Sequence, residues 1–363
     1  MRGSIFSVSD KAMFDAVNQS KVTNSELKEI FLSRGILTSP STSRKDLATY
    51  FSMFTHSYFD YKRLSDLIGT NTRREKTTCT TIADVVDAEI LESSINKIAE
   101  TITSQGARCE AQISSDGKSY TLQIDYEEFN YGNSEFKQVA KRSATITVDL
   151  SEDGITVRHP QNKTVEEWQA LLIAEVEQQA GQELQTSRVS LTHVTDHKKI
   201  TDFFIAIING IDGYKLKDVT DVYVYHPKED EAEQSESDES TDAIALGTHI
   251  SKASLKGQNV LQSEVLKQFY DKEFYLSKIV WRSIAEKSTI DDDIYEFEIQ
   301  FSDPENKDDF SYLAKGFYSY TSEGHHSKSR KALTTYQEQL FNKAIENSAK
   351  QALLQLAGKG DEY

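Results

Sequence analysis

The sequence predicts an α+β protein in which a small helical module precedes two mainly antiparallel αβ domains. Three observations lead to this prediction. Apolar residues recur at helical spacing through the first 70 residues. Further along, alternating polar and apolar runs flank two Asp-Gly turns, at 116–117 and 153–154, a pattern typical of antiparallel hairpins. Finally, 228–242 is strongly acidic and has no large apolar side chain, so it cannot form a packed core.

These observations divide the 363 residues into four parts. We expect a helical basic module at 1–70, a central αβ domain at 71–227, a disordered acidic linker at 228–242, and a C-terminal αβ domain with a long final helix at 243–363. A chain of this length suffices for two or three domains that each have a core of their own.

Four short helices are expected in the N-terminal module. The first is expected at 10–17 and the fourth at about 57–68. The second begins at a Thr23/Asn24 cap and ends before Gly35, and the third begins at a Ser43 cap and continues through Phe51. Hydroxyl and amide side chains of this kind cap helix N-termini, and a glycine commonly follows a helix C-terminus. The residues between the second and third helices are expected to form an extended loop.

The two αβ domains are predicted to combine helices with paired strands. The expected helices are about 84–104, 164–180 with a Thr164/Glu167 capping box, Asp196 to Gly210, 261–272 and 331–357. The expected strands are near 107–113, 118–126, 136–150, 154–159, 187–193, 246–255, 274–284, 293–303 and 310–321. Alternation or an apolar run between turn residues predicts each strand, and apolar spacing with caps predicts each helix.

Charge is distributed unevenly along the chain. The first 80 residues contain 12 Lys and Arg against 8 Asp and Glu, whereas the other 283 contain 29 against 50. The net charge of −17 indicates that any contact with nucleic acid is local. Cys79 and Cys109 do not make a disulfide framework, and no apolar run approaches the length of a membrane span. We therefore expect a cytoplasmic protein without membrane contact.

A helix, an extended loop and a second helix are predicted over 25–51. Residues in this segment resemble the SAP family of small DNA-binding modules, namely Leu27, Lys28, Ile30, Phe31, Arg34-Gly35-Ile36, Arg44-Lys45-Asp46-Leu47 and Phe51. The family usually has a glycine before its second helix, where this chain has Thr42-Ser43. The resemblance covers only this small part of the chain.

The resemblance implies that the module binds the DNA backbone. Phosphate contacts would come from Lys28, Arg34, Arg44 and Lys45, together with backbone N–H groups at the start of the second helix. Further basic residues, Arg73, Arg74 and Lys76, extend this surface. Such contacts give salt-dependent affinity with little sequence preference. The open alternative is a plain helical hairpin that packs on the body or on a protein partner.

A second pattern consists of Asp125 with Glu135-Phe136-Lys137. Its spacing resembles the D…ExK pattern of the restriction-endonuclease-like nucleases. The resemblance implies that Asp125 and Glu135 hold Mg²⁺ and that Lys137 orients or activates the attacking water. The open alternative is an ordinary surface hairpin, because Glu135 follows a turn rather than an apolar strand.

Two further segments carry charged side chains. In the expected strand 293–303, Glu296, Glu298 and Gln300 share one face, and the pattern indicates an ordinary half-exposed strand or a cation site. The basic loop His325 to Lys331 is either a second phosphate contact or a solvated turn. The sequence contains no phosphate-binding glycine loop, CxxC pair or nucleophile elbow.

Together these patterns predict a DNA-binding accessory or regulatory protein that binds the backbone through 25–76 and recruits a protein partner through its acidic body. It needs no cofactor and carries out no chemistry of its own. One alternative is a Mg²⁺-dependent nuclease with its site in the central domain. The other alternative is a protein-interaction subunit that does not bind nucleic acid.

Overall fold

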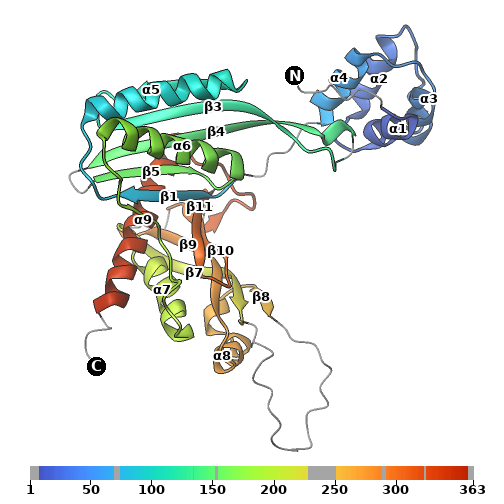
Figure 1. The fold of residues 1–363 in the computed structure, drawn as a ribbon. Coiled ribbons are helices and arrows are strands. Elements are labelled where there is room, and N and C mark those ends of the chain that lie inside the picture. The colour runs from blue at the N-terminus through green and yellow to red at the C-terminus, as the bar shows by residue number, and fades with distance from the viewer. Residues whose placement is uncertain are drawn as a thin grey trace, which may run out of the picture. The chain divides into compact units, whose positions relative to one another are not determined.

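The fold is shown by a computed structural model in Figure 1. The structure describes residues 8–68, 74–133, 135–151, 154–227, 251–287, 292–322 and 324–358. The expected acidic linker at 228–242 lies outside these residues, as do Arg73 and Asp153. Helices and a large antiparallel sheet make up the described chain. This confirms the predicted α+β class with a helical N-terminus.

The chain divides into two compact units. Unit 1 comprises Met1–Arg74, Ala99–Ala111 and Leu122–Thr145, and unit 2 comprises Glu75–Ile98, Gln112–Thr121 and Ile146–Tyr363. The boundary expected at 228–242 does not coincide with a division between these units. The reason is strand pairing within unit 2, where Thr77 of the expected central domain lies opposite Tyr312 of the expected C-terminal domain.

The N-terminal part of unit 1 forms the predicted short helices. They are α1 (Asp10–Asn18), α2 (Asn24–Leu32), α3 (Arg44–Ser52) and α4 (Tyr58–Ile68). Thr23 caps α2 in a capping box with Glu26, and the Ser43 side chain accepts a hydrogen bond from the Asp46 N–H at the start of α3. Gly35 has a φ of 73°, which glycine adopts without steric cost. Both predicted N-caps are confirmed.

An aromatic core holds these helices together. Phe31 of α2 and Phe51 of α3 are almost fully buried, and their ring centres lie 5.9 Å apart. Phe136, from the single-turn helix η1 (Glu135–Lys137), is buried in the same core. Its ring stacks on Tyr61 of α4 with 5.2 Å between the ring centres. The helical module is therefore completed by a turn that lies some 70 residues further along the chain.

The strands form a sheet in the order β2-β3-β4-β5-β1-β11-β10-β9-β7-β8. Their bounds are β1 Thr77–Ile82, β2 Arg108–Ile113, β3 Ser119–Phe129, β4 Val139–Ser151, β5 Gly154–Pro160, β7 Tyr214–Tyr225, β8 Lys252–Lys256, β9 Tyr275–Ala285, β10 Ile294–Asp303 and β11 Asp308–Tyr318. The short strand β6 (Thr186–Ser187) pairs with β1, and β12 (Tyr320–Ser322) pairs with β13 (His325–His326).

Two helices of unit 2, α7 (His197–Asn209) and α9 (Thr335–Gly358), lie on one face of the β9–β11 region (Figure 1). Phe203 of α7 stacks on Phe301 of β10, and Phe341 of α9 contacts Phe297 of the same strand. Trp281 of β9 is fully buried beside them. Because side chains alternate between the faces of a strand, the other face of β10 carries Glu296 and Glu298.

The remaining helices are α5 (Ala88–Ser104), α6 (Lys163–Ala180), η3 (Val260–Gln262) and α8 (Glu264–Asp271). The expected capping box at 164–167 is wrong, because Asn162 is the residue that caps α6. The expected strand 187–193 is also wrong beyond Ser187. Val189 and Leu191 are buried in the core of unit 2, which explains their apolar spacing, but 188–193 forms no ladder.

Among the described residues, none of the helices combines the length and the apolar character needed to cross a membrane.

Candidate anion-binding site

The first predicted phosphate contact, Arg34, is engaged within unit 1. Its guanidinium lies 2.8 Å from the Asp60 carboxylate, and these side chains are only 23% and 24% exposed. Arg34 also donates a hydrogen bond to the Thr55 carbonyl at 3.1 Å, and its Cζ lies 5.2 Å from the Phe51 ring centre. Burial alone would raise the pKa of Asp60, but hydrogen bonds from Ser57 and Arg34 outweigh it and lower that pKa. Arg34 therefore ties the end of α2 to the start of α4.

The second predicted arginine, Arg44, also binds groups within the helical module, where α1 ends and α2 begins. It donates hydrogen bonds to the carbonyl oxygens of Val17 at 3.2 Å and Gln19 at 2.7 Å. A third hydrogen bond, of 2.8 Å, reaches Oδ1 of Asn24. These acceptors lie at the end of α1 and the start of α2. Arg44 thus satisfies carbonyl groups that the end of α1 leaves without helical partners.

The other predicted contacts differ from these arginines in their surroundings. Lys28 and Lys45 are exposed, and neither forms an ion pair within the described residues. Arg74 is exposed at the end of unit 1, and Arg73 lies outside the described residues. Lys76 belongs to unit 2, where it joins a different set of charges. The phosphate surface implied by the SAP resemblance therefore loses Arg34 and Arg44 to contacts within the module, and its binding role stays a prediction.

Exposed apolar side chains lie close in sequence to Arg34 and to the residues that it contacts. In the described part of the helical module they are Leu32, Ile36, Leu37, Tyr50, Met53, Tyr58 and Phe59. They flank the loop after α2 and the connection from α3 to α4, which Arg34 bridges. Apolar clusters of this kind are typical of protein contacts. They favour the alternative of a protein-interaction subunit, which stays a prediction.

The residues of the nuclease pattern do not adopt the expected strand arrangement. Asp125 is exposed on β3, whereas Glu135 and Lys137 lie in η1 rather than on a strand. Phe136 is buried between them, and Glu135 accepts a hydrogen bond of 3.4 Å from Ser9 Oγ. In the part of the chain that the structure describes, no three His, Cys, Asp or Glu side chains are placed to hold a metal ion. This turn anchors the helical module, and the nuclease alternative stays an untested prediction.

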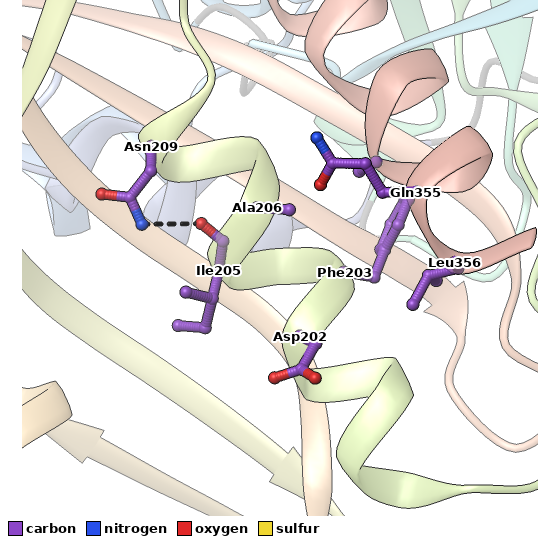
Figure 2. A pocket seen from close by; sticks show the side chains of 8 residues that line it. Asp202, Phe203, Ile205, Ala206, Asn209, Gln355 and Leu356 are labelled. Carbon is purple, nitrogen blue, oxygen red and sulfur yellow. Dashed lines mark hydrogen bonds between the residues drawn. The ribbon is translucent and has the colours of Figure 1, made fainter. Parts of the chain in front are cut away.

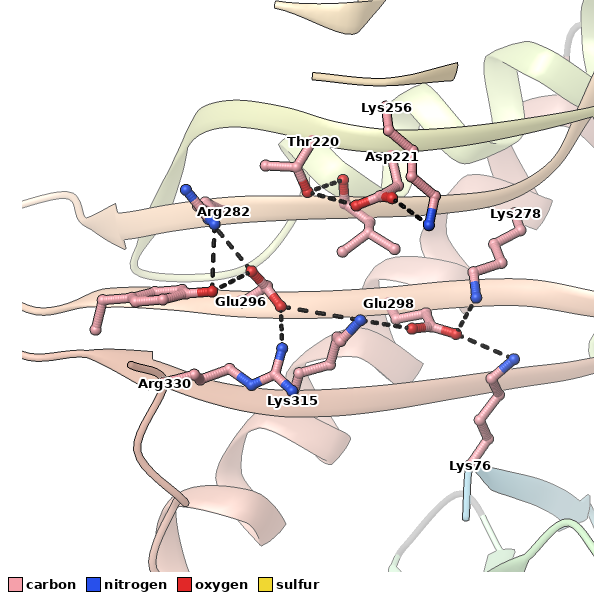
Figure 3. A network of polar contacts seen from close by, with 12 residues as sticks. Lys76, Thr220, Asp221, Lys256, Lys278, Arg282, Glu296, Glu298, Lys315 and Arg330 are labelled. Carbon is pink, nitrogen blue, oxygen red and sulfur yellow. Dashed lines mark hydrogen bonds and ion pairs between the residues drawn. The ribbon is translucent and has the colours of Figure 1, made fainter. Parts of the chain in front are cut away.

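A charged cluster occupies the face of the unit 2 sheet opposite α7 and α9 (Figure 3). At its centre are Glu296 and Glu298 of β10, whose side chains are each 6% exposed. Five cations surround them, namely Lys76 before β1, Lys278 and Arg282 on β9, Lys315 on β11, and Arg330 before α9. We name these seven residues the charged face.

Three lysines hold Glu298. The Nζ atoms of Lys278 and Lys76 lie 2.6 Å and 3.0 Å from Oε1 of Glu298, and Nζ of Lys315 lies 3.0 Å from Oε2. Burial alone would raise the pKa of Glu298. Hydrogen bonds from Lys278 and Lys315 and the charge of Lys76 outweigh burial and lower that pKa to about 2. Glu298 is therefore ionised throughout the physiological pH range.

Glu296 is held by two arginines and a tyrosine. Arg282 Nε lies 3.3 Å from Oε2, and Arg330 pairs with Oε1. The Tyr318 hydroxyl donates a hydrogen bond of 3.0 Å to Oε2. Lys315, at 3.8 Å, connects Glu296 to the Glu298 group. Both carboxylates thus have the paired and hydrogen-bonded environment that a buried charge requires.

The charged face carries more positive than negative charge. Five cations share two carboxylates, so three positive charges remain within the set. The cationic side chains are 18% to 38% exposed and reach solvent. In a chain of net charge −17, this is a local reversal of sign. Because the site is partly buried, its field is screened less than that of cations on an open surface.

Two tyrosines border the charged face. The Tyr223 ring centre of β7 lies 4.9 Å from Nζ of Lys278 and 5.8 Å from Nζ of Lys256. The Tyr318 ring centre lies 4.6 Å from Cζ of Arg282. Lys256 also pairs with Asp221 at 3.3 Å, so this border pair adds no net charge. The face therefore combines cations with half-buried aromatic rings.

A separate cavity of about 260 Å³ lies between α7 and α9 (Figure 2). Asp202 is the one ionisable side chain among its described lining residues. The Asn209 side-chain amide donates a hydrogen bond of 2.8 Å to the Ile205 carbonyl, so one of its N–H donors is already engaged. The cavity is smaller than most ligand pockets, and its lining lacks an acid–base pair. The charged face is therefore the stronger candidate site.

The sequence contains only partial signals for the charged face. The alternation over 293–303 places Glu296 and Glu298 on one side, and the basic loop at 325–331 contains Arg330. The sequence pattern assigns Lys76 to the N-terminal surface instead. No local pattern indicates that Lys76, Lys278 and Lys315 meet, because they come from segments far apart in the chain.

No protein-family model matches this chain, and no curated protein shows significant similarity to it.

Proposed function

We propose that the protein binds the phosphate backbone of a nucleic acid through the charged face. The observation that supports this proposal is the excess of five cations over two buried carboxylates on one sheet face. This keeps the DNA-binding function expected from the sequence but moves it from the helical module to unit 2.

The arrangement suits phosphate binding for a physical reason. The ammonium groups of Lys278 and Lys315 each have three N–H donors, and their contacts with the glutamates leave donors for a phosphate oxygen. The buried carboxylates hold the cations in place before a ligand arrives, which lowers the entropy lost on binding. Charge-assisted hydrogen bonds to phosphate are about twice as strong as neutral ones. Contacts to phosphate alone give affinity with little sequence preference.

The direct test removes one exposed cation at a time and measures oligonucleotide affinity by fluorescence anisotropy. We expect Lys278→Gln and Lys315→Gln each to weaken binding roughly tenfold, because each removes a charged hydrogen-bond donor. Lys267→Gln is the matched control, since Lys267 pairs only with Glu264 on the exposed surface of α8. Circular dichroism and thermal unfolding check that the variants keep their fold.

Two further variants test which part of the molecule binds the phosphates. Lys45→Gln tests the helical module, and a loss of affinity there with no loss in Lys278→Gln would return the site to the SAP-like segment. Glu298→Gln removes the carboxylate that positions three lysines, so we expect it to weaken binding although it raises the net charge of the face. Unchanged affinity in both Lys278→Gln and Lys315→Gln contradicts the proposal.

A further inference from the structure

The two tyrosines that border the charged face, Tyr223 and Tyr318, indicate which form of nucleic acid the face binds. Tyr223 lies beside Lys278, and Tyr318 lies beside Arg282, so each ring accompanies a cation of β9. Lys278 and Arg282 are four residues apart on one strand, which corresponds to about 13 Å. The two rings are therefore spaced along the same row of cations, and both side chains are half-buried.

Strand register places further polar residues in one row with Tyr223 and Lys278. Lys278 lies opposite Tyr223 on one side and opposite Gln300 on the other, and Gln300 in turn lies opposite Ser311. This row crosses four neighbouring strands, β7, β9, β10 and β11, and three spacings of about 4.8 Å give a width of roughly 14 Å. The face is thus broad and combines cations, the Gln300 amide and aromatic rings, whereas Ser311 at its end is fully buried.

A platform of this kind suits a single strand better than a duplex. A duplex keeps its bases stacked inside and presents only its phosphate backbone to a broad sheet face. A single strand exposes the faces of its bases, and these stack on aromatic side chains while the phosphates meet neighbouring cations. A tyrosine hydroxyl can donate a hydrogen bond to a phosphate oxygen, but stacking on the tyrosine ring requires a ligand with accessible bases.

We propose that the charged face binds single-stranded nucleic acid in preference to a duplex, with bases stacked on Tyr223 and Tyr318 and phosphates bound by Lys278 and Lys315. This inference rests on the proposed function and specifies its ligand. Lys256 is 63% exposed, so it exchanges its contact with the Tyr223 ring for a phosphate contact when a base stacks there. Tyr318 keeps its hydroxyl on Glu296 while its ring serves as a platform.

The first experiment uses the unmodified full chain and four anionic probes of matched charge. These are a labelled oligodeoxythymidine, an abasic oligonucleotide of equal length, a duplex, and inorganic polyphosphate. We expect the oligodeoxythymidine to bind at least tenfold more tightly than the other three, because only it offers accessible bases. Equal affinity for the oligodeoxythymidine and the abasic probe, or for the single strand and the duplex, overturns the inference.

The second experiment changes the rings. Tyr223→Leu and Tyr318→Leu are each expected to weaken oligodeoxythymidine binding about tenfold and to leave polyphosphate binding unchanged. Tyr223→Phe keeps the ring and is expected to retain the affinity. If the leucine variants bind the single strand normally, the stacking role is wrong.

Failure of the inference and failure of the proposed function give different results. If no probe binds, or if Lys278→Gln has no effect on any probe, the charged face is not a phosphate site. If the lysine variants weaken all four probes equally and the tyrosine variants weaken none, the proposed function holds and the preference for a single strand is wrong.

Discussion

At the scale of single residues, basic side chains have opposite roles in the two units. Arg34 and Arg44 stand in a segment rich in exposed positions, yet their guanidinium groups satisfy a carboxylate and carbonyl oxygens inside the helical module. Lys278 and Lys315, in contrast, border buried carboxylates but keep part of their surface in solvent. The local sequence does not distinguish these roles. An arginine followed by a glycine has the same sequence pattern whether the arginine binds a phosphate or Asp60.

Glu298 gives a residue-scale prediction about acid stability. Its pKa is about 2 in the folded protein, against an ordinary value of 4.5, so its ionised form stabilises the fold. This stabilisation is complete above pH 4.5 and is lost as the pH falls toward 2. The difference corresponds to roughly 3 kcal/mol in the free energy of unfolding. Urea unfolding at several pH values between 5 and 2 measures it.

The matched variant for this prediction is Glu298→Gln. It is less stable at pH 7, because three lysines then lack their shared carboxylate, and its stability depends less on pH between 4.5 and 2. An identical pH dependence in the variant and the unmodified protein would show that other carboxylates account for the acid loss.

At the scale of secondary structure elements, helix ends were more predictable than strands. The N-caps at Thr23, Ser43 and Asp196 are those that the sequence indicated, because a cap depends on residues three positions away at most. The expected strand 187–193 is wrong because a strand, unlike a helix cap, depends on pairing with another segment. Val189 and Leu191 show an apolar alternation because both are buried in the core of unit 2, but 188–193 has no partner strand among the described residues.

The cap of α3 supports a prediction at this scale. Ser43→Ala removes the side-chain oxygen that accepts the Asp46 N–H at 3.1 Å, so we expect a loss of about 1 kcal/mol in the free energy of unfolding. Thr42→Ala, one residue outside the cap, serves as the control. The measurement is urea unfolding followed by circular dichroism. Equal losses in both variants would assign the effect to the loop and not to the cap.

At the scale of the whole molecule, the charge balance determines how an anion approaches. The chain carries −17, but the charged face carries an excess of three positive charges on one side of the unit 2 sheet. A polyanion is repelled by the net charge of the chain and attracted locally to this face. Contact of this kind is local and electrostatic.

Salt dependence follows from this charge distribution. If about four cations of the face neutralise phosphates, a plot of log affinity against log salt concentration has a slope of about −3 for a single strand. Lys315→Gln is expected to make that slope less steep by about 0.7. Anisotropy titrations between 50 and 300 mM salt, roughly the range over which such contacts weaken strongly, provide the measurement. A slope near zero would mean that phosphates are not the recognised groups.

The sequence by itself determined the α+β class, the four short helices, the N-caps at Thr23 and Ser43, and the two-sided pattern of β10, because each depends on neighbours within a few residues. Only the tertiary structure decided that Phe136 completes the helical module and that Lys76, Lys278, Arg282, Lys315 and Arg330 converge on Glu296 and Glu298. These contacts join segments up to about 220 residues apart. Strand pairing brings the charged groups together, and a one-residue change in the register of β10 would turn Glu296 and Glu298 to the opposite face.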